Sequence, residues 1–220
     1  MEILTLESRG TNKMKRRKGI LIAIEGIDGS GKTTQSKLLY EALVKMGFPT
    51  VLSHEPTEGP FGEEIRKKLA TSGLTPEEAY DLFVRDRKEH VNKKIIPSLE
   101  AGKIVIVDRY FISTIAYQGA GGISLNKIIA DHEKFAPIPD LVIILDIPVD
   151  EAIKRLTNKN RDSFERNRSF LQEVRRIYLN IGKLLKTKVI IIDARKNVNE
   201  IHKEILFHVL ELIKERFTGG

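Results

Sequence analysis

Short apolar runs that alternate with amphipathic stretches restrict the fold of this chain more than any other feature. Five runs are nearly continuous in Ile, Val and Leu, and they span residues 19–25, 50–53, 104–108, 141–146 and 189–193. Strands of this composition are typical of a parallel sheet that is covered on both faces. The pattern therefore predicts five buried parallel strands.

Amphipathic stretches with helical spacing lie between these runs and after the last one. They span residues 32–46, 63–70, 76–101, 124–135, 150–159, 162–185 and 199–216. Alternating strands and helices predict a doubly wound α/β fold with right-handed crossovers. Since no repeat or internal linker divides the chain, we expect one domain over residues 19–220. The basic tail over residues 1–18 is expected to be a solvated arm or, alternatively, a nucleic-acid contact.

The composition excludes several classes of protein. The chain has no cysteine, so it forms no disulfide, thiol nucleophile or cysteine metal site. No apolar run approaches the roughly 18 residues of a membrane span, and the first residues lack the pattern of a secretory signal. We therefore expect a cytoplasmic protein. The net charge of +7 fits an acidic small substrate, nucleic acid or merely a charged surface.

A complete phosphate-binding motif, G-x-x-x-x-G-K-[ST], occupies residues 26–33. It follows the first predicted strand and opens the first predicted helix, which is the context that a P-loop requires. Its glycines let backbone amides approach a polyphosphate, and the helix N-terminus adds a positive dipole. We expect Lys32 to neutralise phosphate oxygens and the Thr33 hydroxyl to bind Mg²⁺. The residues expected to bind the nucleotide are Gly26, Ile27, Asp28, Gly29, Ser30, Gly31, Lys32, Thr33 and Thr34.

An acid and an arginine, Asp108 and Arg109, follow the third predicted strand. Ligands of open parallel sheets bind beyond the carboxyl ends of the strands. We therefore expect Asp108 to face the metal and Arg109 to bind a phosphate through its two-pronged guanidinium. The Asn-Lys-x-Asp motif of GTPases is absent, and the small size of the chain favours a small-molecule kinase of the P-loop NTPase type.

Five ordered segments make the chain resemble the thymidylate kinase family. They are residues 24–35, 55–57, 82–87, 108–119 and 139–146, and the resemblance extends over residues 19–216. The string Asp-Arg-Tyr…Ser…Ala-Tyr-Gln-Gly within 108–119 is more specific than the P-loop. The resemblance implies Mg²⁺-dependent transfer of the ATP γ-phosphate to dTMP, which gives dTDP, and it implies a homodimer.

The resemblance also implies roles for residues outside the P-loop. Phe83 would stack on thymine, and Arg87, one helical turn later, would address the base. Arg109 would bind the acceptor phosphate, Tyr117 would crowd the 2′ position of the sugar, and Asp28 would lie near the 3′-hydroxyl. The remaining residues expected at the substrate are Glu55, Pro56, Ser113, Thr114 and Gln118.

A basic lid over about residues 155–168 is the last expected part of the site. Some thymidylate kinases carry a P-loop arginine at the position of Gly29, and others supply basic residues from a lid. We expect Arg161 to act as the catalytic lid cation, followed by Lys159 and Arg155. Ser163 stands where the family usually has an arginine, which leaves the choice among these cations open.

Three alternative functions stay open from the sequence. The chain could be another nucleoside monophosphate or deoxynucleoside kinase, against which Phe83, Arg87, Thr114 and Gln118 argue. It could be a nucleic-acid-binding P-loop ATPase, although no nucleic-acid motif supports this. It could also be a catalytically silent nucleotide sensor, which its intact P-loop disfavours.

Overall fold

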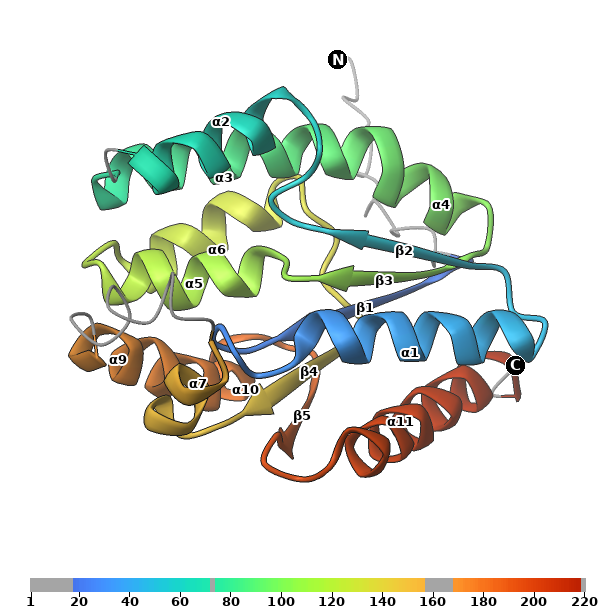
Figure 1. Ribbon diagram of the computed structural model, residues 1–220. Coiled ribbons are helices and arrows are strands. Elements are labelled where there is room, and N and C mark those ends of the chain that lie inside the picture. The colour runs from blue at the N-terminus through green and yellow to red at the C-terminus, as the bar shows by residue number, and fades with distance from the viewer. Residues whose placement is uncertain (1–17, 72–73, 157–167, 219–220) are drawn as a thin grey trace, which may run out of the picture.

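A five-stranded, all-parallel sheet lies between two layers of helices (Figure 1). The computed structural model describes residues 18–71, 74–156 and 168–218. The sheet has the order β2-β3-β1-β4-β5. Its strands are β1 (Ile20–Glu25), β2 (Thr50–His54), β3 (Ile104–Asp108), β4 (Leu141–Asp146) and β5 (Lys188–Asp193). The predicted α/β fold with five parallel strands is confirmed.

The helices cover both faces of the sheet (Figure 1). One face is covered by α1 (Lys32–Lys45) and α11 (Val198–Thr218). The other helices are α2 (Pro60–Thr71), α3 (Pro76–His90), α4 (Ile96–Glu100), α5 (Phe111–Ala120), α6 (Leu125–Glu133), α7 (Val149–Arg155), α9 (Arg168–Leu179) and α10 (Ile181–Leu184). None of the helices in the described ranges is both long and apolar enough to cross a membrane.

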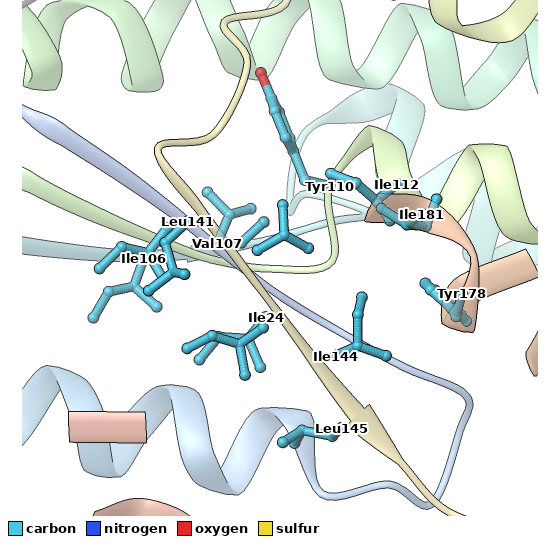
Figure 2. Close-up of a cluster of buried hydrophobic side chains, with 14 of the residues drawn as sticks. Ile24, Ile106, Val107, Tyr110, Ile112, Leu141, Ile144, Leu145, Tyr178 and Ile181 are labelled. Carbon is cyan, nitrogen blue, oxygen red and sulfur yellow. The ribbon is translucent and has the colours of Figure 1, made fainter. Parts of the chain in front are cut away.

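Strand β1 lies at the centre of the core. All six of its residues are buried, because it pairs with β3 on one edge and β4 on the other while helices cover both faces. Ile22 illustrates this position, since it pairs with Ile106 of β3 and with Leu141 of β4. Figure 2 shows apolar side chains of these three strands gathered in one cluster. Burial on both faces explains why these runs are continuously apolar instead of alternating.

Three predicted helices differ more from the structure than the others, whose bounds shift by one to three residues. The stretch 76–101 contains α3, a π-helical turn η1 (Val91–Ile95) and then α4. The wider turn precedes Pro97, which has no N–H to donate to an α-helical bond. Helix α7 ends at Arg155, before the predicted end at 159, because Leu156 has extended backbone. In the described part of 162–185, helices α9 and α10 are separate on either side of Asn180.

Helix α5 is absent from the helices that the sequence analysis predicts. It packs against α3, α6 and α9, so it has apolar or buried residues on most of its sides. It therefore lacks the single polar face that reveals an amphipathic helix. Its N-cap residue, Tyr110, makes no side-chain capping bond, so the usual start signal is also missing.

We predict that Ile22→Ala lowers the free energy of unfolding by about 2–5 kcal/mol, because the fully buried side chain leaves a cavity in a packed core. Ile191→Ala is the matched control, since Ile191 lies in edge strand β5 and is 46% exposed. It should cost less than about 1 kcal/mol. Urea unfolding measures both, and equal losses would contradict the central position of β1.

Candidate active site

The P-loop connects the buried end of β1 to the start of α1. Its position is a topological switch point, since the flanking strands β3 and β4 lie on opposite sides of β1. The loop closes tightly at Gly29, which has φ +80°. A Cβ atom there would lie 2.5 Å from the Ala152 carbonyl oxygen on α7. An arginine therefore cannot occupy position 29 unless α7 moves away.

A cleft of about 660 Å³ opens above this loop. It brings together most of the predicted nucleotide-binding residues and both members of the Asp-Arg pair, together with Glu55. The lining residues are Asp28, Gly29, Gly31, Lys32, Thr33, Thr34, Ser36, Lys37, Leu52, Ser53, His54, Glu55, Asp108, Arg109 and Arg155. Gly26, Ile27 and Ser30 belong to the same loop but do not line the cleft.

Lys32 lies at the floor of the cleft and is 6% exposed. Its Nζ donates a hydrogen bond of 2.8 Å to the Ile27 carbonyl. Burial, reinforced by the positive charge of Arg109, lowers the pKa of Lys32 to about 8. An anion in the cleft would offset both effects, so the site is suited to a phosphate.

Thr33 and Asp108 meet at one side of the cleft. The Thr33 hydroxyl donates a 2.5 Å hydrogen bond to Asp108 Oδ2, and both residues line the cleft. Hydroxyl and carboxylate oxygens are ligands that Mg²⁺ accepts, with the rest of its shell coming from phosphates and water. These two residues therefore fit the predicted metal site.

Arg109 joins the P-loop to the start of α5. Its Nη2 donates to Asp28 Oδ1 at 2.5 Å, and its Nη1 donates to the Gly26 carbonyl at 3.3 Å and to Ser113 Oγ at 3.2 Å. A guanidinium has five N–H donors, and these three bonds use only some of them. The guanidinium can thus bind a phosphate while it stays attached to the loop.

Asp28 and Tyr117 lie beside this arginine. The Tyr117 hydroxyl donates to Asp28 Oδ2 at 3.3 Å, and the Arg109 guanidinium lies 5.4 Å from the centroid of the Tyr117 ring. Although burial opposes it, the charges of Arg109 and Lys32 hold the pKa of Asp28 below its ordinary value. Asp28 is therefore an anion that can accept a hydrogen bond from a substrate hydroxyl.

Arg87 is held in a buried network, only 1% exposed. Its Nε and Nη2 donate to Glu55 Oε2 at 2.8 and 2.6 Å. Its Nη1 donates to Thr114 Oγ1 and to His132 Nε2, both at 2.9 Å. The His132 Nδ1–H donates to the Ile128 carbonyl, and burial, with the charge of Arg87, lowers the pKa of His132 to about 3. His132 is thus a neutral acceptor that helps to orient Arg87.

The other oxygen of Glu55 continues this network towards β2. Glu55 Oε1 lies 2.9 Å from His90 Nδ1, and His90 Nε2 lies 2.7 Å from Ser53 Oγ. The sequence analysis overlooked His90, Ser53 and His132. His54 also lines the cleft; it is exposed, and its Nε2 lies 3.3 Å from Glu58 Oε1.

Several predicted substrate residues lie outside the cleft. Phe83 is half-buried on α3, one turn before Arg87, and Gln118 is buried on α5. Pro56 follows Glu55 through a cis peptide bond. Arg161 and Lys159 lie outside the described residues. Arg155, the remaining lid candidate, lines the cleft and donates from Nη2 to the Ala194 carbonyl at 2.9 Å.

Comparison with known proteins decides the family. A model of the family described as "Thymidylate kinase" matches residues 24–205. A "Probable thymidylate kinase" of Thermococcus gammatolerans is 40% identical over 212 residues, which cover 92% of this chain and 99% of that relative. A "Thymidylate kinase" of Desulfotalea psychrophila is 38% identical over 205 residues, which cover 91% and 99% respectively. This chain belongs to the thymidylate kinase family. It is therefore a phosphotransferase of the kinase class.

Glu25 is a further residue of this thymidylate kinase site for which the sequence predicted no role. It is fully buried and accepts hydrogen bonds from Tyr110 N at 2.7 Å, Ser113 Oγ at 2.6 Å and Tyr178 Oη at 3.2 Å. Burial raises the pKa of Glu25 to about 7, against the opposing effects of Ser113 and Arg109. Tyr178 is also buried, and its hydroxyl reaches this site. The sequence signal that could have revealed Glu25 is its position as an acidic residue at the end of an apolar strand.

We predict that Glu25→Gln changes how stability depends on pH. Because the folded state raises the pKa of Glu25 from 4.5 to about 7, it holds this proton more tightly than the unfolded chain. The wild type should therefore lose stability relative to the variant as the pH rises between these values. The difference should approach about 3 kcal/mol in free energy of unfolding. Urea titrations from pH 4.5 to 8 measure it, and a constant difference would contradict the shifted pKa.

Proposed function

We propose that this chain transfers the γ-phosphoryl group of ATP to dTMP, giving dTDP and ADP. The observation that carries the proposal is the direct bond between Arg109 and Asp28, which holds the Arg109 guanidinium at the P-loop in one cleft and supports a role for it at the acceptor phosphate. The family membership and the names of the relatives support dTMP as the acceptor.

Catalysis would depend on positioning and charge, because phosphoryl transfer needs little covalent work from the protein. Lys32 would bind the phosphates of ATP through its buried ammonium. Arg109 would hold the dTMP phosphate with N–H groups that its bonds to Asp28, Gly26 and Ser113 do not use. Thr33 and Asp108 would hold Mg²⁺, which when bound neutralises charge on the phosphate oxygens. With both phosphates fixed in one cleft, the acceptor oxygen lies near the transferring group.

The nucleoside of dTMP would lie between α3 and α5. Phe83 and Arg87 of α3, with Thr114 and Gln118 of α5, are proposed to recognise thymine. The hydrogen bonds of Arg87 support this proposal. They run to Glu55, Thr114 and His132, and they hold the guanidinium in one orientation before any substrate binds. Asp28 and Tyr117 are proposed to lie at the deoxyribose, and Pro56 and Ser113 complete the proposed substrate set.

The chain is proposed to act as one domain over residues 19–220, in the cytoplasm, and as a homodimer. Family resemblance supports the domain and the dimer, and the sequence features described above support the location. Sedimentation of the full chain tests the dimer: a single species at twice the 24.9 kDa chain mass is expected. A species at the chain mass would contradict it.

We predict that Lys32→Ala lowers the rate of dTDP formation by at least about 100-fold, since each ~1.4 kcal/mol of lost transition-state stabilisation is a factor of ten. Lys45→Ala is the matched control, because Lys45 is exposed at the far end of the same helix. It should retain parental turnover. Chromatographic detection of dTDP measures both variants, and near-parental turnover in a folded Lys32→Ala chain would refute the P-loop assignment.

We also predict that a lid cation completes the charge at the transferring group, since Gly29 has no room for a side chain. Arg161→Ala should raise the activation barrier by about 2–4 kcal/mol and so lower kcat, while the KM for dTMP stays within a few-fold of the parental value. Lys159→Ala and Arg155→Ala are measured in parallel. Parental kcat in all three variants and in the triple variant would mean that no lid cation is catalytic.

A further inference from the structure

The buried carboxylate of Glu25 is a charged group that the proposed mechanism leaves unused. It is 0% exposed, and its oxygens accept hydrogen bonds from Tyr110, Ser113 and Tyr178, which surround the arginine proposed to bind the acceptor phosphate. We propose that Glu25 is a positioning residue for Arg109, which it holds both through the backbone and through the side chain. This inference rests on the proposed role of Arg109 at the dTMP phosphate.

The backbone contact acts on the peptide that follows Arg109. Arg109 has φ +66°, and it is the one residue other than glycine with positive φ in the described part of the chain. Such a conformation is disfavoured for a residue with a side chain, so the surrounding structure must impose it. Glu25 Oε1 accepts from the N–H of Tyr110 at 2.7 Å, directly after this residue. The Arg109 N–H donates to the Ile24 carbonyl at 3.0 Å, which fixes the other side.

The side-chain contact runs through Ser113. The Ser113 hydroxyl donates to Glu25 Oε2 at 2.6 Å and accepts from Arg109 Nη1 at 3.2 Å. A carboxylate only accepts hydrogen bonds, so it obliges Ser113 to donate to it. The lone pairs of the serine oxygen are then available to the guanidinium. An amide at position 25 could instead donate to Ser113, which would turn its hydroxyl hydrogen towards Arg109.

The position of Glu25 in the chain links these contacts to the P-loop. Glu25 immediately precedes Gly26, whose carbonyl accepts from Arg109 Nη1 at 3.3 Å. The Tyr178 hydroxyl, from α9, lies 2.9 Å from Ser113 Oγ and 3.2 Å from Glu25 Oε2. One carboxylate thus joins β1, the turn after β3 and α9 around the arginine. The phosphate-binding part of the acceptor site should depend on Glu25. The base-binding residues on α3 and α5 should not, since the Glu25 bonds described above go to Tyr110, Ser113 and Tyr178 instead.

The test compares a ligand that has the phosphate with one that lacks it. Calorimetry at pH 8 gives the Kd of dTMP and of thymidine for the wild type, Glu25→Gln, Arg109→Ala and the double variant. Glu25→Gln should weaken dTMP binding at least tenfold and change thymidine binding less than twofold. Because Glu25 acts through Arg109, the double variant should bind dTMP within twofold of Arg109→Ala alone.

Asp140→Asn is the matched control for a purely structural effect. Asp140 Oδ2 accepts from Leu21 N at 2.8 Å near the opposite end of β1, and Asp140 also pairs with Arg216. Its loss should lower the melting temperature without changing either Kd by more than twofold.

If Glu25→Gln does not fold, Tyr178→Phe takes its place, and it should weaken dTMP binding about two- to fivefold and leave thymidine binding unchanged.

Any of four results would overturn the inference. Equal weakening of dTMP and thymidine by Glu25→Gln, or by Tyr178→Phe where that variant replaces it, would show a general structural role. A double variant much weaker than Arg109→Ala would show that Glu25 acts independently of the arginine. Retention of the wild-type preference for dTMP over thymidine in Glu25→Gln refutes this inference alone. A wild type that shows no such preference refutes the proposed function as well.

Discussion

Strand β1 is paired along both edges and covered on both faces, and the position of every group in the site depends on it. Its six residues are buried, so its register against β3 and β4 cannot shift without exposing apolar surface. The strand therefore brings the P-loop to a fixed point at the carboxyl edge of the sheet. The same pairing sets Ile24 beside Asp108, which places the second motif next to the first.

The charges at this edge form a balanced set. Lys32 and Arg109 are cations, Asp28 and Asp108 are carboxylates, and Glu25 lies beneath them. Burying any one of these charges alone would be costly, so each is found beside a hydrogen-bond partner. Burial, reinforced by the charge of Arg109, lowers the pKa of Lys32, so an anion bound in the cleft would stabilise its charged form. The cleft is thus organised for phosphate before a nucleotide binds, and little reorganisation is left for the reaction itself.

The sequence was sufficient to predict what depends on local pattern. The five strands follow from continuous apolar runs, and the P-loop and the Asp108–Arg109 pair follow from motifs at strand ends. Helix α5 could not be predicted, because burial on most of its sides removed the helical polar face. The burial of Arg87 could not be predicted either, since it depends on Glu55, Thr114 and His132, which approach from three distant segments. The role of Glu25 is visible only when Tyr110, Ser113 and Tyr178 are placed around it.

We infer that this cleft holds ATP and a thymine nucleotide together for transfer of the γ-phosphoryl group. Coupled ADP release tests it most directly, with ATP and each of dTMP, dUMP, UMP, dCMP, AMP and GMP as acceptor for the wild-type chain. We expect kcat/KM to be highest for dTMP, because the site combines the arginine proposed to bind the acceptor phosphate with the residues proposed to recognise thymine. Absence of dTMP-dependent ADP release, or a higher kcat/KM for AMP or GMP, would contradict it.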